Sequence, residues 1–262
     1  MWTCERSQGR VRWAMPTRAR HGRKVDKRTK SGLNGAAMRG LYAIVDVTTL
    51  RARGLPVVEF ARAVVAAKPC ALQLRAKDAS PSETLNLLRA IRSVCREGGV
   101  PLFANDRVDL ACLAGCDGVH VGQDDMPVPL ARDIAKGLRI GVSTHDVVQV
   151  ERALADEPDY VAFGPVYPTK SKANPDPVVG IDALARVVER CPMPVVAIGG
   201  IDAERAAEVG RVCPVAAVIG ALVPEGLTPR DMGWVTQRAR DLHATLLRSW
   251  EQRGEKTSRP VS

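Results

Sequence analysis

From Leu41 onward one pattern repeats eight times: a short apolar or β-branched run, a polar turn, and an amphipathic segment. Amphipathic helices are expected, for example, over residues 58–67, 82–97 and 180–190. Strands that alternate with helices pair in parallel, because each crossover needs a helix. Eight such units predict an α/β fold of the (β/α)₈ TIM-barrel type. The expected strands are residues 41–46, 71–75, 101–106, 118–122, 140–144, 160–165, 195–200 and 215–220.

A doubly wound open sheet is the alternative fold, and the sequence disfavours it. That fold would place a G-x-G-x-x-G turn after the first strand, whereas LYAIVDVTTL (41–50) contains no glycine. We expect one catalytic barrel domain over residues 39–250, whose final helix runs from about Arg230 to Trp250. Residues 251–262 are expected to form a flexible C-terminal tail.

The N-terminal residues carry almost all of the excess positive charge. The chain has a net charge of +9, and residues 1–37 hold ten Lys/Arg and two acids, which leaves about +1 for the rest. Without apolar periodicity, residues 1–38 are predicted to be a basic, disordered extension. Three interpretations are open: a solvated extension or a start codon assigned upstream of Met38, an arm for nucleic acid, and a transit peptide. The first is favoured, because the run lacks interleaved aromatic residues.

Localisation and cysteine usage point to the cytoplasm. The sequence has no run of about 20 apolar residues and no secretory signal pattern at its start. Seven cysteines are scattered along the chain, and Cys112 and Cys116 are four residues apart. No second Cys or His pair follows at zinc-finger spacing, so we expect buried, reduced thiols instead of a metal site.

Polar residues gather where the predicted strands end. In a barrel these ends form one rim, on which active sites assemble. Gln73 and Arg75 share the inward face of their strand, and Arg75 either binds an anion or pairs with Asp46 or Asp106. His120 is expected to be a satisfied pocket histidine. The rim residues are Gln73, Arg75, Lys77, Asn105, Asp106, Gln123, Asp124, Asp125, Ser143, Thr144 and His145.

Some of these residues have two possible roles. Asp106 is a candidate both for the cap of the helix that follows its strand and for a metal ligand, and these two roles are not exclusive. The last two predicted strands end in Gly199–Gly200 and Ile219–Gly220, and backbone N–H groups at a helix start after such strands can hold a phosphate. The long loop 165–177 contains Thr169, Lys170, Ser171 and Lys172, which suit an anion clamp in a lid. Carboxylates for Mg²⁺ and cations for phosphates together predict a metal-bound diphosphate as ligand.

Seven motifs resemble the thiamine-phosphate synthase family, in order and over about residues 40–222. They are QLRAK (73–77), FANDRVDLA (103–111), DGVHVGQDD (117–125), GVSTH (141–145), GPVYPTKSK (164–172), PDPVVG (175–180) and AIGGI (197–201). The resemblance implies a TIM-barrel transferase of thiamine biosynthesis. In the implied reaction a thiazole nitrogen displaces diphosphate from 4-amino-2-methyl-5-(diphosphooxymethyl)pyrimidine and yields thiamine phosphate. The neutral thiazole nitrogen needs no general base.

The same resemblance assigns the site residues. Asp106 and Asp125 would bind Mg²⁺, the implied cofactor. Leu74, Ala76 and Lys170 lie between assigned residues and complete the substrate-binding set, and the catalytic residues would be Arg75, Lys77, Ser143 and Lys172. The pyrimidine diphosphate would contact Gln73, Arg75, Lys77, Asn105, Ser143 and Lys172. The thiazole phosphate would contact Thr169, Ser171, Gly200, Ile219 and Gly220.

The chain departs from the family pattern at a few positions. Ala76 and Asp78 stand where Glu and Gly are frequent, Ser171 replaces a common Thr, and Gly220 stands where Ser is frequent. A thiazole tautomerase on the same barrel is the competing function, but it has no diphosphate to bind. The expected partners are two small-molecule substrates, with no nucleic acid and no membrane, and a homo-oligomer remains open.

Overall fold

The computed structural model describes residues 4–7, 10–13, 38–169, 176–223 and 225–257. The chain divides into two units, Met1–Asn34 and Gly35–Ser262. In the first unit, β1 (Cys4–Ser7) pairs antiparallel with β2 (Arg10–Trp13). Residues 1–3, 8–9 and 14–37 of the predicted 1–38 extension lie outside the described residues, so their expected disorder stays a prediction.

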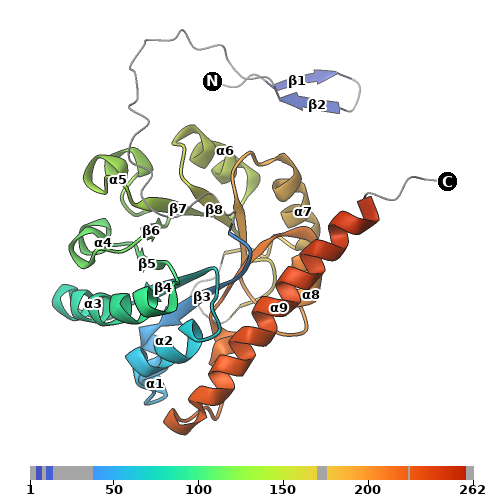
Figure 1. The fold of residues 1–262 in the computed structure, drawn as a ribbon. Coiled ribbons are helices and arrows are strands. Elements are labelled where there is room, and N and C mark those ends of the chain that lie inside the picture. The colour runs from blue at the N-terminus through green and yellow to red at the C-terminus, as the bar shows by residue number, and fades with distance from the viewer. Residues whose placement is uncertain (1–3, 8–9, 14–37, 170–175, 224, 258–262) are drawn as a thin grey trace. The chain divides into compact units, whose positions relative to one another are not determined.

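The second unit is a closed barrel of eight parallel strands, ordered β10-β3-β4-β5-β6-β7-β8-β9 (Figure 1). The predicted TIM-barrel fold is therefore confirmed, and each predicted strand overlaps an observed one. Five of the eight observed strands end one or two residues earlier than we expected, and most of the residues left out of the sheet are glycines, such as Gly122 and Gly199. The strands are β3 (Gly40–Asp46), β4 (Ala71–Arg75), β5 (Leu102–Asn105), β6 (Gly118–Val121), β7 (Arg139–Thr144), β8 (Tyr160–Phe163), β9 (Val195–Ile198) and β10 (Val215–Val218).

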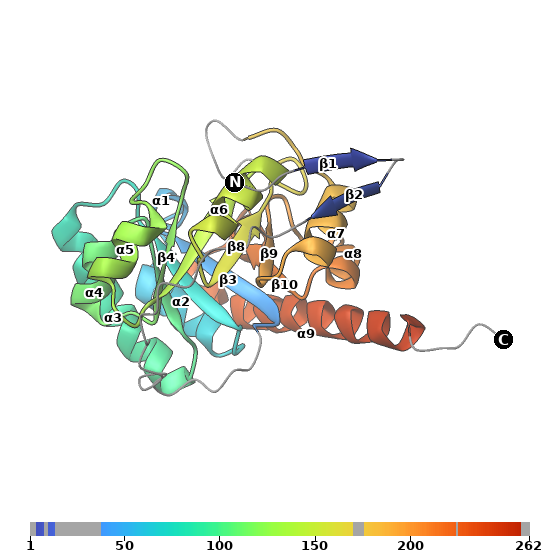
Figure 2. The ribbon, with the colours of Figure 1, turned by 90° about the horizontal axis from the view of Figure 1, so that it is seen from above.

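Helices surround the strands on the outside (Figures 1 and 2). None of those in the described ranges is both long and apolar enough to cross a membrane. The α-helices are α1 (Val47–Ala52), α2 (Val57–Val65), α3 (Pro81–Gly98), α4 (Val108–Ala114), α5 (Val128–Ile134), α6 (Val147–Ala155), α7 (Ile181–Arg190), α8 (Ala206–Val212) and α9 (Met232–Thr257). Two 3₁₀ turns, η1 (Gly220–Leu222) and η2 (Pro229–Asp231), precede α9.

Helix α3 shows how local sequence sets these boundaries. The Ser80 side chain accepts a hydrogen bond from the Glu83 backbone N–H at 3.2 Å, and Pro81 occupies the first helical position, where no N–H is needed. At the other end Gly99 adopts a left-handed conformation with φ +69°, which ends the helix. The predicted helix over 82–97 therefore matches the observed one to within one residue at each end.

Alternate residues of each strand face two different apolar layers. Tyr42, Phe103 and Tyr160 pack with each other inside the barrel. Leu72 and Leu74 belong to the larger core between strands and helices. Gln73 therefore faces the barrel interior, as the alternation along β4 predicted.

Helix α9 packs against α8, α2 and β3, and it extends to Thr257 instead of ending near Trp250. Arg253 stacks on the Trp250 ring at 4.9 Å and donates to the Val212 carbonyl at 3.4 Å. These contacts anchor a turn that the polar sequence EQRGEKT led us to assign to the flexible tail. Residues 258–262 lie outside the described part of the chain.

His243 on α9 makes the stability of the fold depend on pH. Its Nδ1 accepts a hydrogen bond from the Leu41 backbone N–H at 3.1 Å, at the start of β3, so this nitrogen must be unprotonated. Burial lowers the pKa of His243 below its ordinary value. The unfolded chain therefore binds the proton more readily, and this stabilisation is complete above about pH 6.5 and is lost as the pH falls through the unfolded and then the folded pKa.

We expect His243→Asn to weaken this pH dependence, because an amide oxygen can accept the same hydrogen bond without titrating. The urea midpoint of wild type should fall between about pH 7.5 and pH 5.5, and the midpoint of the variant should fall less. Equal slopes for the two proteins would show that His243 is not the responsible group.

Candidate active site

The predicted rim residues that the structure describes lie at the carboxyl ends of the barrel strands. Gln73 and Arg75 come from β4, Asn105 ends β5, and Ser143 lies on β7. Arg75 forms an ion pair with Asp46 at the end of β3, where the Asp46 carboxylate also accepts from the Thr49 backbone N–H at 2.9 Å. The ion-pair alternative for Arg75 is thus present, and it holds the guanidinium at the rim.

A chain of hydrogen bonds crosses the barrel interior beneath the rim. Gln73 Nε2 donates to Tyr42 Oη at 3.0 Å, and the hydroxyls of Tyr42 and Tyr160 are 3.0 Å apart. Tyr160 Oη lies 3.0 Å from His120 Nδ1, and His120 Nε2 lies 2.8 Å from Ser143 Oγ. His120 is therefore a satisfied pocket histidine, as expected.

The side chains of Tyr42 and Tyr160 remain neutral within this series of hydrogen bonds. Burial raises the pKa of both Tyr42 and Tyr160 well above the ordinary value. A neutral phenol both donates and accepts hydrogen bonds, so the tyrosines can relay the orientation of Gln73 to His120 and Ser143. We did not assign Tyr42 or Tyr160 from the sequence. The signal was available, because each occupies an inward position on its strand.

Asp106 and Asp125 lie together although they are nineteen positions apart in sequence. The Asp106 backbone N–H donates to the His120 carbonyl at 2.8 Å, and this brings the end of β5 beside the end of β6. Asp125 accepts from the Gly122 N–H at 2.7 Å. Lys77 Nζ is 3.0 Å from Asp106 Oδ2. Two carboxyl groups and one ammonium group therefore form one cluster at the rim.

Asp106 is not a helix cap. Helix α4 begins at Val108 with Arg107 as its N-cap residue, and Asp106 itself has the uncommon positive φ of 62°. Burial raises the pKa of Asp106, the hydrogen-bonded Asp125 raises it further, and Lys77 opposes both effects. Ionising both carboxyl groups of this pair costs free energy, because they are partly buried and repel each other. A bound cation would offset that cost by neutralising their charge.

The donor set at this cluster fits a hard divalent cation such as Mg²⁺. Asp106 and Asp125 both offer carboxylate oxygens, which this ion prefers. Among the described residues no group of three or more His, Cys, Asp or Glu side chains could hold a metal alone. Such an ion would need further oxygens from a phosphorylated ligand and water, which is how Mg²⁺ is usually bound beside phosphates.

Asp124, next to this cluster in sequence, has a different environment. Its side chain is exposed, whereas Asp125 is half-buried. The turn that follows β6 thus places the two adjacent acids in different environments. Only Asp125 belongs to the carboxyl pair.

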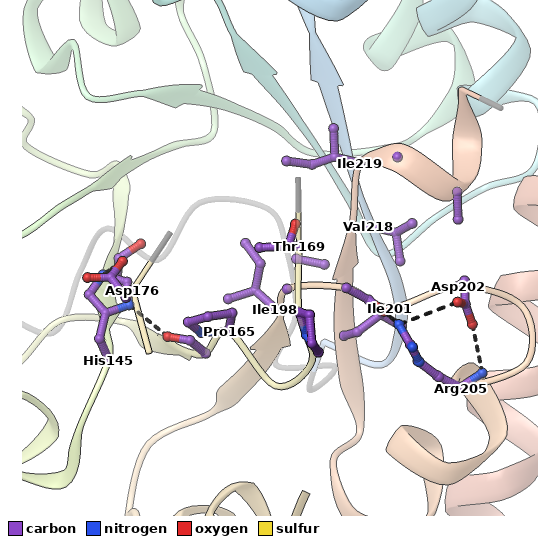
Figure 3. A pocket seen from close by; sticks show the side chains of 18 residues that line it. His145, Pro165, Thr169, Asp176, Ile198, Ile201, Asp202, Arg205, Val218 and Ile219 are labelled. Atoms are coloured by element: carbon purple, nitrogen blue, oxygen red, sulfur yellow. Dashed lines mark hydrogen bonds and ion pairs between the residues drawn. The ribbon is translucent and has the colours of Figure 1, made fainter. Parts of the chain in front are cut away.

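A cavity of about 310 Å³ opens beside β8, β9 and β10 (Figure 3). Thr169, Gly200, Ile219 and Gly220 line it, as do His145 and Asp176 on the side of β7. A second cavity of about 70 Å³ lies inside the barrel and is lined by Gln73, Arg75, Asn105 and His120, together with both tyrosines. Both cavities are lined by Ser143, Ile198, Ala217 and Ile219.

The Gly199–Gly200 turn does not lead directly into a helix, contrary to our expectation. Helix α8 begins only at Ala206, so Gly200 does not lie at a helix start. Gly199 and Gly200 instead have φ of +99° and +65°, values that favour glycine. A Cβ on Gly200 would approach the Pro168 carbonyl oxygen to 2.4 Å, so the turn lies directly against the loop after β8.

Other predicted residues divide into three groups. Leu74 packs in the outer core, so its side chain does not face either cavity, and Ala76 follows the end of β4. Ile219 and Gly220 line the larger cavity as expected, and η1 begins at Gly220. Lys170, Ser171 and Lys172 lie outside the described residues, and their predicted roles stay predictions.

The family model and the curated relatives identify the family of this chain. The family model described as thiamine monophosphate synthase matches residues 41–222. A thiamine-phosphate synthase of Methanocella arvoryzae is 42% identical over 208 residues, which cover 79% of this chain and 94% of that protein. One from Anaeromyxobacter dehalogenans is 40% identical over 212 residues, covering 79% and 92%. The solved thiamine phosphate pyrophosphorylase of Pyrococcus furiosus has a TM-score of 0.69 and 32% identity, and covers 80% of this chain and 96% of its own.

Proposed function

Because this chain belongs to the thiamine monophosphate synthase family and is a transferase of thiamine biosynthesis, we propose that its two adjoining cavities hold the pyrimidine diphosphate and the thiazole phosphate. The observation that supports this proposal most strongly is the shared wall. Gln73, Arg75 and Asn105, expected to bind one substrate, line the inner cavity. Thr169, Gly200 and Gly220, expected to bind the other, line the outer cavity, and Ser143 and Ile219 line both. The two reacting carbon and nitrogen atoms can then meet between them.

The inner cavity would hold the pyrimidine ring. Gln73 and Ser143 offer hydrogen bonds to its amino group and ring nitrogens, and the neutral tyrosine chain keeps both side chains oriented. Apolar residues such as Ile198 and Ala217 exclude water from the methylene carbon. Exclusion of water protects a reactive pyrimidine methylene cation from hydrolysis.

The diphosphate would lie on the rim, against Arg75 and Lys77. These cations stabilise the negative charge that grows on the leaving oxygen as the carbon–oxygen bond breaks. Asp106 and Asp125 would hold Mg²⁺, which supplies further positive charge to the diphosphate when it is bound. Arg75 is kept in place by Asp46, so its charge is preorganised and does not have to move during the reaction.

The outer cavity would hold the thiazole with its phosphate on the Gly199–Gly200 and Ile219–Gly220 backbone. A neutral ring nitrogen attacks the methylene carbon, so no proton has to be removed and no general base is needed.

We further propose that the enzyme acts in the cytoplasm. The six described cysteines of the barrel unit are free thiols, which agrees with a reducing compartment.

The test is direct. The protein is incubated with the pyrimidine diphosphate, the thiazole phosphate and Mg²⁺, and thiamine phosphate is quantified together with diphosphate. Equal amounts of both products are expected, and their formation should stop when the metal is removed by chelation. A folded protein that forms neither product, or that only isomerises the thiazole, would contradict the proposal that the two cavities hold the two substrates of a synthase reaction (the synthase proposal).

Gly220→Ser should improve binding of the thiazole phosphate. A Cβ at Gly220 would meet no atom within 4 Å, so the side chain fits, and its hydroxyl adds a hydrogen-bond donor near the phosphate. One such bond is worth about 1 kcal/mol, so the KM for thiazole phosphate should fall by about fivefold. Gly220→Ala is the matched control and should leave this KM unchanged. An equal improvement by alanine would contradict the hydrogen-bond explanation.

A further inference from the structure

Arg205 is a charged residue of the outer cavity that no sequence motif singled out. It follows β9 and immediately precedes α8, and it lines the cavity together with Gly200 and Asp202. Figure 3 shows Arg205 beside Asp202 and well away from His145 and Asp176. Among the described residues that line this cavity, Arg205 is the one arginine or lysine.

The guanidinium group of Arg205 is bonded to the glycine turn. Its Nη1 donates to the Gly200 carbonyl at 2.7 Å, and the same atom lies 3.6 Å from Asp202 Oδ2. Asp202 in turn accepts from the Arg205 backbone N–H at 2.9 Å. These contacts close a small ring of bonds from Gly200 to the start of α8, so the direction of the Gly200 carbonyl is set by the arginine.

Arg205 also reaches the loop after β8. Its guanidinium carbon lies 4.7 Å from the centre of the Tyr167 ring, in a cation–π arrangement. The Tyr167 hydroxyl donates to Glu208 Oε2 on α8 at 2.6 Å, and the Tyr167 backbone N–H donates to the Gly199 carbonyl at 3.1 Å. Tyr167 is therefore fixed at both ends, and its ring offers a rigid surface over which the guanidinium group of Arg205 lies.

The Gly199–Gly200 turn, which lies against the loop after β8, depends on contacts of this kind to keep one conformation. Gly199 and Gly200 both have positive φ, and glycine has more conformational freedom than any other residue. A Cβ on Gly200 would also approach Tyr167 Cβ to 2.8 Å, so the loop and the turn are in close contact. When the Gly200 carbonyl is held by Arg205 on one side of the peptide, the neighbouring backbone N–H groups are held in fixed directions as well.

We propose that Arg205 is a positioning residue that holds the Gly199–Gly200 turn in the conformation that receives the phosphate of the thiazole substrate. The inference rests on the proposed function for the identity of that substrate. It predicts that Arg205 acts on substrate affinity through the phosphate group and contributes little to the displacement of diphosphate. A planar guanidinium has donors in a fixed fork and a face that can stack on the ring, whereas a lysine ammonium is a compact point charge with no such face.

Steady-state kinetics of Arg205→Met, Arg205→Lys and wild type test the proposal. Arg205→Met should raise the KM for thiazole phosphate by about tenfold or more, while the KM for the pyrimidine diphosphate and the kcat at saturation change by less than about twofold. Arg205→Lys should recover less than half of the loss. Arg211→Met, an exposed position on α8, is the matched control and should behave as wild type.

The unphosphorylated thiazole alcohol separates positioning of the phosphate turn from general damage. We expect kcat/KM for the alcohol to be equal in wild type and Arg205→Met. The proposal is overturned if the variant loses as much activity with the alcohol as with the phosphate, or if both substrate KM values rise together. Full recovery by Arg205→Lys would also overturn it, since that result assigns the effect to positive charge alone.

Direct calorimetric titration of the full chain with thiazole phosphate keeps this inference distinct from the synthase proposal. If the protein makes no thiamine phosphate but binds thiazole phosphate more weakly in Arg205→Met, the synthase proposal fails and the role of Arg205 stands. If thiamine phosphate is formed and the variant binds thiazole phosphate as wild type does, the role of Arg205 fails and the synthase proposal stands.

Discussion

Asp125→Asn is expected to lower kcat/KM by about a hundredfold or more, whereas Asp124→Asn should retain at least half of wild-type activity. The two acids are adjacent in sequence and the substitutions remove the same charge. Their environments differ, because Asp125 is paired with Asp106 near Lys77 and Asp124 is exposed to solvent. A carboxylate that helps to bind a metal loses one of its anionic oxygens when it becomes an amide.

The measurement is kcat/KM for the pyrimidine diphosphate at saturating thiazole phosphate, repeated over a range of Mg²⁺ concentrations. Asp125→Asn should need more Mg²⁺ for half-maximal activity, and Asp124→Asn should not. Both variants should unfold at nearly the same temperature as wild type. Equal losses in the two variants would refute the assignment of Asp125 as a metal ligand.

Lys77→Met should lower kcat by about a hundredfold, up to a limit of about a thousandfold. Two unit charges near 4 Å at an effective dielectric of about 20 interact by about 4 kcal/mol, and about 1.4 kcal/mol is tenfold in rate. Lys77 is 51% exposed, so its removal leaves no buried cavity in the barrel. The loss would therefore report on charge at the rim and not on the stability of the fold.

Two control variants are needed to interpret the loss of kcat in Lys77→Met. Lys136→Met removes a charge from an exposed position away from the rim, and its kcat should match that of wild type. Lys77→Arg keeps the charge and should restore part of the activity. If Lys136→Met lost as much activity as Lys77→Met, the effect would come from the net charge of the protein, and Lys77 would have no specific role.

The barrel and its rim were predictable because their signals are local. Apolar runs such as 71–75 alternate with amphipathic segments, and the hydrophobic period of each segment follows from which face it buries. The inward direction of Gln73 followed from the same alternation. The carboxyl ends of the strands did not follow from the alternation, because glycines such as Gly122 and Gly199 leave the sheet without any change of period in the sequence.

The bonds within the site could not be predicted in the same way. The chain from Gln73 through Tyr42, Tyr160 and His120 to Ser143 joins five different strands, and the register of parallel strands sets which residues face each other. Sequence order carries no such pairing. The family motifs named individual residues, but the partners of each residue depend on the closed barrel.

Sequence alone determined the architecture, the rim on which the polar residues collect, and the pair Asp106 and Asp125 through the family motifs. The tertiary structure decided that Asp106 is not a cap, that Arg75 is held by Asp46, and that Arg205 supports the glycine turn. The physical reason is the range of the interactions. Helix and strand preferences act between residues near in sequence, whereas hydrogen bonds and ion pairs act over a few ångströms between segments that only the folded barrel brings together.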